Sequence, residues 1–497
     1  MRGSGRQSHT GAFAAVPRRL APATIAGLAG LAGLAGLVTP RAALADEPVS
    51  AREKRLMQET GENTTVIDAF DKDDPFDANL SLAFRQQWKS ANVRRESGLN
   101  QAGLSTGGFV ASTDSVARYR QSISTLEIGA DIGIFRDLAL SFRLPLILAD
   151  SRELSDLDGS AGNPQRLRDP SGEQLFSVPF KSPTRSGIDQ LAVGLDYAIF
   201  NQLRDPAMPT WVLGAESRFA VGPRLHACNA AGAVQCPDPA NPSAPGRDPG
   251  ISRGMTTLAL HTIFGRRFGY VEPYLGFRAQ VELPAANSDY GATSDVNGSL
   301  LRRPPVVGRF TVGTEVYPYE NRESFQRLSL DFKVHGTYHS PGREYSELFD
   351  ALGASPARSL RDGNPSAFKG DATTSTADPA APKVFFTGIT DQQAYGSFGG
   401  ALGVTMQAGE YVKFNAGLGL TYAQSHLVTA SDACNPEVKG GPGTSGPCRA
   451  GGSSTGGSTA TGTPNPNHRQ VIDLPGRRFS VDDTTIVDLW VSSTVMF

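Results

Sequence analysis

One short run of the sequence gathers side chains of the types that catalytic sites use. Asp331, His335 and His339 recur at every fourth residue, and Ser340 follows directly. The alternation around them predicts a strand, in which residues four apart are separated by about 13 Å along the axis. At that separation the two histidines cannot act on one substrate atom without groups from other strands. We also find no H-E-x-x-H motif and no phosphate-binding glycine loop. We therefore expect no enzyme activity, no catalytic residue, no bound cofactor and no metal.

The four cysteines form two closely spaced sets, Cys228 with Cys236 and Cys434 with Cys448. An even number in an exported chain favours disulfides. The short spacing favours one bond within each set over bonds between the sets. A zinc site built from His226, Cys228 and Cys236 is the alternative, but no fourth ligand is obvious.

A cluster of carboxylates precedes the patterned part of the chain. Its members, five in ten residues, are Asp68, Asp71, Asp73, Asp74 and Asp77. The glycine-turn spacing of a calcium loop is missing. We interpret residues 46–77 as a solvated acidic periplasmic segment; the alternative is that it folds into the lumen as a plug or contacts a periplasmic partner.

The first 45 residues have the features of a secretory signal peptide. Arginines precede the apolar stretch Ile25–Val38, and Ala43-Leu44-Ala45 closes the segment as a small-x-small cleavage pattern. We therefore predict export, with 1–45 removed and the mature chain carrying a net charge of about −7 (42 basic and 49 acidic residues).

Composition excludes two large classes of protein. A mean hydropathy of −0.25 over 497 residues leaves no room for repeated apolar helices of about 20 residues. The 47 basic and 49 acidic residues provide no bulk positive field for nucleic acid. We expect no nucleic-acid partner.

The rest of the chain repeats one pattern, a run of strict apolar–polar alternation followed by a break. In Leu126–Ile134, for example, apolar residues occupy the even positions, with Glu127 and Asp131 among the odd ones. Period-two alternation predicts a strand between two different solvents. Twelve such segments are present, at 78–91, 118–134, 138–149, 188–200, 210–222, 255–267, 271–283, 306–319, 326–340, 394–408, 411–426 and 484–497.

Short and long breaks alternate between these segments. This arrangement is typical of a transmembrane up-and-down antiparallel β-barrel with short periplasmic turns and long extracellular loops. We therefore predict an all-β fold, a barrel of about 12 strands over 78–497, in contact with bacterial outer-membrane lipid and with both termini periplasmic. A water-soluble β-sandwich is the competing fold, but it gives no reason for the two classes of break.

Aromatic residues mark the borders at the short breaks, as expected where lipid meets water. They are Phe76, Phe135, Phe200, Phe268, Tyr270, Tyr319, Tyr411 and Phe497. The terminal Phe497 resembles the signal that the bacterial barrel-assembly machinery reads, so we expect that machinery as a partner during biogenesis.

The polar positions of the twelve segments are predicted to face the lumen. The candidate lumen-lining charges are Arg85, Glu127, Asp131, Arg143, Asp196, Glu216, Arg218, Arg278, Glu282, Arg309, Glu315, Asp331, Lys333, His335, Lys413 and Asp488, and His261 has the same parity. So many charges need water or internal pairing. We expect mostly bracing ion pairs, such as Glu127 or Asp131 with Arg143, around a narrow lumen. The near-balance of sign predicts weak ion selectivity.

The long break 341–393 contains one further element. The run Glu344–Leu352 could form a short helix, which would act as a lid or an inward plug.

Two stretches, STLEIGADIGIFRDLALSFRLPL and GIDQLAVGLDYAIFNQLRDPAMPTWVLGAESRFAVG, resemble the outer-membrane channel family of the meta-pathway of phenol degradation. The likeness covers about residues 118–284 and, less clearly, 394–426. Membership would imply passive uptake of small, aromatic or apolar molecules. We therefore predict a passive channel or transporter for small-molecule solutes; the alternative is a closed structural, adhesive or assembly-partner barrel that binds through its extracellular loops.

Overall fold

The computed structural model describes residues 66–67, 77–97, 112–157, 164–241, 243–244, 246–285, 289–290, 303–366, 368–369, 376–435, 448–449 and 460–497. The chain divides into two units, 1–50 and 51–497, and all described residues belong to the second. The predicted signal peptide and four of the five clustered aspartates (all but Asp77) lie outside the described residues.

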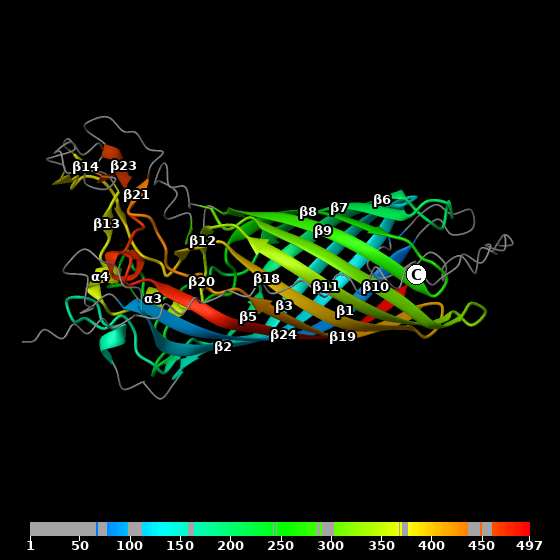
Figure 1. Cartoon of the computed structure of the whole chain (residues 1–497), viewed down its shortest axis with the longest axis horizontal. Helices are drawn as coiled ribbons and strands as arrows, with labels where there is room; N and C mark the ends of the chain where they lie inside the picture. The colour runs from blue at the N-terminus through cyan, green and yellow to red at the C-terminus, as the bar shows by residue number, and fades with distance from the viewer. Residues whose placement is uncertain are drawn as a thin grey trace, which may run out of the picture. The chain divides into compact units, whose positions relative to one another are not determined.

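Twelve long strands form one closed antiparallel sheet. Each pairs with its neighbour in chain order, and β1 pairs with β24 to complete the ring (Figure 1). The twelve are β1 (Ala78–Ser97), β2 (Ser112–Phe135), β3 (Leu138–Ser155), β6 (Gln190–Phe200), β7 (Thr210–Ala220), β8 (Met255–Gly265), β9 (Val271–Pro284), β10 (Val307–Asn321), β11 (Gln326–His339), β18 (Tyr395–Gln407), β19 (Val412–Ala423) and β24 (Phe479–Met496). The predicted up-and-down barrel of twelve strands is confirmed, and closure rules out the sandwich.

The short connections all lie at one end of the barrel. They span 136–137, 201–209, 266–270, 322–325 and 408–411. The first and last strands meet at the same end, where the Phe497 amide donates to the Ala78 carbonyl at 2.8 Å. In Figure 1 this turn end carries the C-terminus, and the small elements of the long loops gather at the opposite end. We call the latter the loop end.

The outer face of the barrel is apolar and uncovered. Ile128 is 54% exposed, Leu260 67% and Leu402 55%, whereas Glu127 and Arg143 have the opposite parity. Exposure of so many apolar side chains to water would be unfavourable, whereas their contact with lipid acyl chains is favourable. Because the sheet is closed, no strand edge lacks hydrogen-bond partners in the lipid. The fold is therefore that of an outer-membrane barrel.

Exposed aromatic rings occupy the turn-end border, as the sequence predicted. They are Phe135, Phe200, Phe268, Tyr270, Tyr319, Tyr411 and Phe497; Phe76 lies outside the described residues. A second exposed set, which the sequence did not single out, lies nearer the loop end and comprises Trp88, Phe219, Tyr338 and Tyr422. Two aromatic girdles bound the outer face of a membrane barrel.

Four neighbouring strands are longer than predicted, always at the loop end. β1 continues past residue 91, β24 begins before residue 484, and β2 and β3 are extended in the same direction. Val93 and Val481, in these extensions, are fully buried. One face of the extensions packs against loops instead of lipid, so the apolar–polar alternation that marks the membrane part is lost there.

The loop-end residues form a second packed region, which we call the cap. It comprises the described parts of 164–189, 221–254, 340–394 and 424–478. Its core joins strand extensions to loop residues such as Leu348, Leu360 and Ile472. Its elements are η1 (Pro164–Leu167), β4 (Phe180–Lys181), β5 (Arg185–Ile188), β12 (Gly342–Glu344), α3 (Phe349–Gly353), α4 (Arg358–Arg361), β13 (Asn364–Pro365), β14 (Phe368–Lys369), β15 (Thr376–Ala377), β16 (Lys383–Val384), β17 (Thr390–Gln392), β20 (His426–Leu427), β21 (Cys434–Asn435), β22 (Cys448–Arg449), β23 (Ala460–Pro464) and α5 (Gln470–Asp473).

The helix predicted over Glu344–Leu352 is only partly correct. α3 begins at Phe349, while Glu344 ends β12 and pairs with Thr390 of β17. A strand partner from a distant part of the same loop therefore determines the conformation of Glu344. None of the helices in the described ranges has the length and apolar character needed to cross a bilayer.

Candidate lumen site

The inner face of β2 and β3 carries the ion pair that the sequence predicted. Arg143 lies 2.7 Å from Asp131 and 4.0 Å from Glu127. Ser141, opposite Asp131, and Gly129, opposite Arg143, complete the register. The arginine thus bridges two acids of the adjoining strand.

A second set of pairs follows along β6 to β9. Glu216 accepts hydrogen bonds from Arg218 of its own strand at 2.5 Å and from Arg278, two strands away, at 2.7 Å. Asp196 lies 2.8 Å from the His261 ring, again across one intervening strand. Partners two strands apart were not predicted, because the sequence does not fix the register across strands that are joined by long loops.

The seam where the barrel closes has its own pair. Arg85 of β1 donates from Nε and Nη2 to Asp488 of β24, at 3.0 and 2.7 Å, and Gln87 donates to the same carboxylate. These residues stand some 400 positions apart in the chain and meet only because the sheet closes.

Buried carboxylates cluster toward the turn end. Asp331 contacts Lys333 at 3.0 Å and accepts a 2.7 Å hydrogen bond from Tyr274. Glu315 is 2% exposed and shares the Tyr317 hydroxyl with Glu272, at 2.9 and 2.8 Å. Glu272 was not among the predicted residues, although it has the polar parity of its strand.

Four predicted residues take no part in the contacts given so far, and one of them, Glu282, is described below with the cap. His335 shares a 3.2 Å hydrogen bond with Thr421, and Lys413 is half-buried on β19. Arg309 is exposed on β10 and is opposite Arg278 in the register. Among the described residues, Arg309 forms no ion pair within 4.0 Å.

The inner pairs run along the wall instead of across the lumen. Each ion pair described above joins residues of one strand or of strands separated by at most one other. Glycines make this possible: a Cβ on Gly313 would come within 3.0 Å of the Tyr274 ring, and one on Gly417 would overlap the Trp490 ring. Large side chains therefore lie flat over glycines of neighbouring strands.

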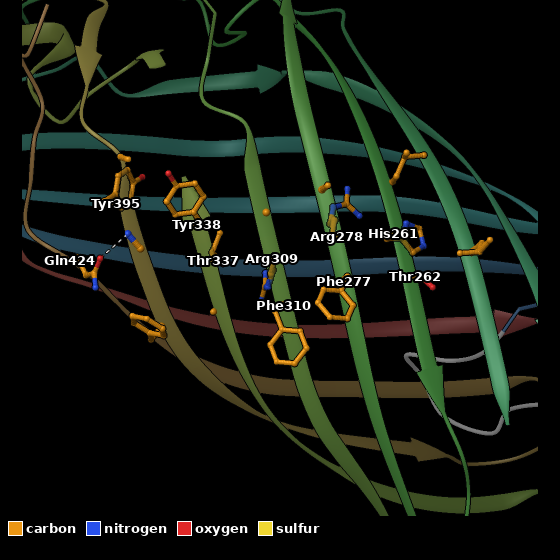
Figure 2. A pocket seen from close by; sticks show the side chains of 18 residues that line it. His261, Thr262, Phe277, Arg278, Arg309, Phe310, Thr337, Tyr338, Tyr395 and Gln424 are labelled. Atoms are coloured by element: carbon orange, nitrogen blue, oxygen red, sulfur yellow. Dashed lines mark hydrogen bonds between the residues drawn. The ribbon is translucent and has the colours of Figure 1, made fainter. Parts of the chain in front are cut away.

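The alternation of faces is visible on β8 to β11 (Figure 2). Phe277 and Phe310 lie side by side with ring centroids 4.8 Å apart, and both are exposed. A furrow of about 850 Å³ runs past them. Arg278 and Arg309, the adjacent residues on the same strands, have the opposite parity and belong to the lumen wall.

Part of the long loop 340–394 folds down onto the barrel mouth. Glu344 pairs with Arg253 at 2.8 Å, and Arg253 in turn pairs with the predicted lumen residue Glu282 at 2.5 Å. Glu347 lies 2.6 Å from Lys89 of β1. Burial alone would raise the pKa of Glu347, but the charges of Lys89 and His426 and the hydrogen bonds to the carboxylate together outweigh burial and hold that pKa below its ordinary value.

A buried ion pair ties this segment to the rest of the cap. Arg185 of β5 donates two hydrogen bonds to Asp350 of α3, at 2.6 and 3.1 Å, and its side chain is fully buried. Asp350 also accepts a 2.9 Å bond from the Cys228 amide. The segment 342–353 is therefore anchored to two other loops.

The predicted Cys228–Cys236 disulfide is present. It replaces the alternative zinc site, and His226 lies instead 3.2 Å from Asp289. The side chains of the second predicted pair, Cys434 and Cys448, lie outside the described residues.

A cavity of about 300 Å³ separates the folded-down segment from the barrel wall. Lys89, Arg152 and His339 line it from the barrel side, and Tyr345 and Glu347 from the loop side. The segment thus lies against the barrel mouth, and its action as a lid or a plug stays a prediction.

The histidines considered for catalysis have separate partners. His335 contacts Thr421, whereas His339 stacks on Tyr395 with ring centroids 4.3 Å apart, and Tyr395 stacks on His426 at 3.8 Å. Neither ring has a hydrogen-bonded acid and nucleophile arranged as a catalytic unit among the described residues.

Two residues of the acidic segment pack against the barrel. Val66 is buried against Ala139, Ala198 and Val212, with Ile67 beside them. At these residues the segment differs from a solvated tether, because an apolar contact with the wall is available.

No family model matches the sequence, and no curated protein matches it. Several solved structures are similar. An outer membrane channel from Pseudomonas putida F1 is 10% identical, with 84% of this chain and 95% of that chain covered and a TM-score of 0.33. The outer membrane protease OmpT from Escherichia coli is 7% identical (85% and 96% covered, TM-score 0.26), and a Pseudomonas aeruginosa FadL homologue is 9% identical (84% and 90% covered, TM-score 0.28).

These likenesses are to outer-membrane proteins, a channel among them, as the resemblance in the sequence predicted. Their TM-scores are too low to carry an argument about activity, and the phenol-pathway family remains a prediction.

Proposed function

We propose that this protein is a non-catalytic outer-membrane channel or transporter for the passive passage of small solutes. The observation that carries the proposal is that the inner charges and large rings lie along the wall. Bracing of this kind leaves more room along the axis than pairs that crossed the lumen would, although the charges of Arg85 and Arg309, on strands separated by four others, still act on each other there. The segment 342–353 then acts as the constriction of the path.

Planar-bilayer recordings of the purified protein test the proposal. Stable single-channel steps are expected, and liposome swelling with sugars, amino acids and phenolics would define the solutes. A bilayer that stays silent would contradict the channel.

A pair of glycine variants sharpens this test. Gly313→Ala forces the Tyr274 ring off the wall, so conductance should fall. Gly403→Ala meets its nearest atom only at 3.5 Å and should leave conductance unchanged. Equal conductance in both variants would contradict the wall-lying arrangement as the source of the open axis.

A closed scaffold that binds through its loops is the second candidate, and the packed core of the cap favours it. If the barrel is a closed scaffold, no variant of the cap should conduct ions. If it is a channel, a variant that loosens the segment 342–353 should conduct.

We also propose that the loop end is extracellular and that both termini are periplasmic. Supporting this, the chain ends meet at the end with short turns, and Phe497 is exposed beside lipid. Cysteines placed in the cap should react with impermeant reagents in whole cells. Removal of Phe497 should reduce the amount of assembled barrel.

A further inference from the structure

The inner-face cations are more accessible than the carboxylates that pair with them. Exposed side-chain fractions are 58% for Arg85 against 13% for Asp488, and 28% for Arg278 against 18% for Glu216. Lys333, at 24% against 10% for Asp331, follows the same order. Two pairs have the opposite order: Glu127, at 42% against 31% for Arg143, and Asp196, at 26% against 20% for His261. The sequence balances charge, but the surface that a solute meets is mainly cationic.

Arg309 has no compensating acid of its own. It is exposed on β10, forms no hydrogen bond and no ion pair among the described residues, and is the register partner of Arg278. Both Arg85 and Arg278 lie close enough for their charges to act on it, and so does Asp488. Asp488 is already engaged by two donors of Arg85.

Neighbouring guanidiniums retain free donors. In the described part of the chain, Arg278 donates to Glu216 only through Nη2, and Arg309 donates to no protein group. The planar fork of a guanidinium matches the two oxygens of a carboxylate. Because Arg278 and Arg309 are opposite each other on adjacent strands, their two positive charges favour the binding of an anion between them.

An apolar surface adjoins Arg85. Trp490 is the register partner of Arg85, and its ring lies over Gly417 with the indole N–H bonded to Asn415 at 2.7 Å. The ring can cover the hydrocarbon part of a bound solute, which an inorganic anion lacks.

From these observations we infer that Arg309, with Arg278 and Arg85, forms a subsite for small organic carboxylates within the lumen. The inference rests on the proposed channel and names its solute class. It departs from the weak selectivity that the balanced composition predicts.

Two measurements test the subsite on the full-length protein. In a KCl gradient the reversal potential should show anion preference, and Arg309→Gln should shift it toward potassium. Arg120→Gln is the control, because Arg120 lies outside the subsite. Its pair with Glu153 is long, at 3.9 Å, and both side chains are about half exposed. Potassium selectivity in the wild type, or equal potentials in wild type and Arg309→Gln, would overturn the inference.

The second measurement does not require conduction. Butyrate titrated into the detergent-solubilised protein should give a saturable change in tryptophan fluorescence, with about tenfold weaker binding in Arg309→Gln. Inorganic phosphate should bind more weakly than butyrate. Phosphate binding as tight as butyrate, or no saturable response to butyrate, would overturn the carboxylate subsite. Butyrate binding in a protein that gives a silent bilayer would overturn the channel but retain the subsite.

Discussion

The parts of the twelve barrel strands whose outer face is exposed, which we call the belt, and the cap place apolar side chains in opposite environments. In the belt, Leu260 is 67% exposed and charged residues point inward; in the cap, Leu348 and Phe349 are fully buried. A single strand passes through both regimes: Leu82 of β1 is 51% exposed, while Val93 on the same strand is fully buried. The belt thus depends on lipid as its solvent, whereas the cap is built like a water-soluble domain with its own core.

The largest expected effect comes from breaking the cap's buried ion pair. Arg185→Ala leaves Asp350 buried without its charged partner, which should destabilise the cap by about 3–5 kcal/mol. Hydrogen exchange of residues 342–353 should accelerate, while the belt stays protected.

The exposed pair Arg120–Glu153 provides the matched control. Its atoms are 3.9 Å apart and both side chains are about half exposed, so Arg120→Ala should cost about 1 kcal/mol or less. If the two variants exchanged alike, the cap would not depend on a desolvated pair.

A charge on the outer face should damage the belt by the next largest amount. Leu402→Arg faces lipid and should cost about 2–4 kcal/mol near the bilayer centre. Ser492→Arg, on the inner face of β24, should cost clearly less. Urea unfolding in lipid vesicles, followed by heat-modifiable electrophoresis, measures both; equal midpoints would show that the two faces do not differ in solvent.

Removal of the cap's disulfide is expected to have a moderate effect. Replacing Cys228 and Cys236 together by serine reopens a short loop and should cost about 2 kcal/mol. Exchange of the Cys228 amide, which donates to Asp350, reports the loss. A reductant should accelerate exchange of the amide at position 228 in the wild type and leave the exchange of that amide unchanged in the double variant.

The smallest effect should be the pH dependence of the cap. Burial raises the pKa of Asp473 to about 7, although its oxygens accept amide hydrogen bonds from Arg469 and Ser431. Because the folded value is raised, this contribution is fully present below about pH 4 and is lost as the pH rises through 7.

Between pH 6 and 8 the cap should therefore lose about 1 kcal/mol. Asp473→Asn should remove that slope in hydrogen-exchange measurements across the same range. A slope that persists in the variant would assign it to another group.

The sequence predicted more of the belt than of the cap. All twelve belt strands were predicted, as was the pairing of Arg143 with Asp131, because adjacent strands joined by a short turn have a register that alternation and turn length fix. The Cys228–Cys236 bond followed from spacing. In the cap, the extensions of β1 and β24, the pair Arg185–Asp350 and the true start of α3 were not predicted, since each depends on a distant loop.

The sequence by itself determined which face of each strand is apolar, and with it the closed barrel, because the direction of a strand side chain is a local property with a period of two. The tertiary structure alone decided which charges meet. Arg85 meets Asp488 because the sheet closes, Glu216 pairs with Arg278 across an intervening strand, and Arg309 forms no ion pair with any acid that the structure describes. The energy of an ion pair falls as the distance between its side chains grows, and position in the chain does not specify that distance. The net charge exposed in the lumen is therefore determined only by the assembled sheet and its loops.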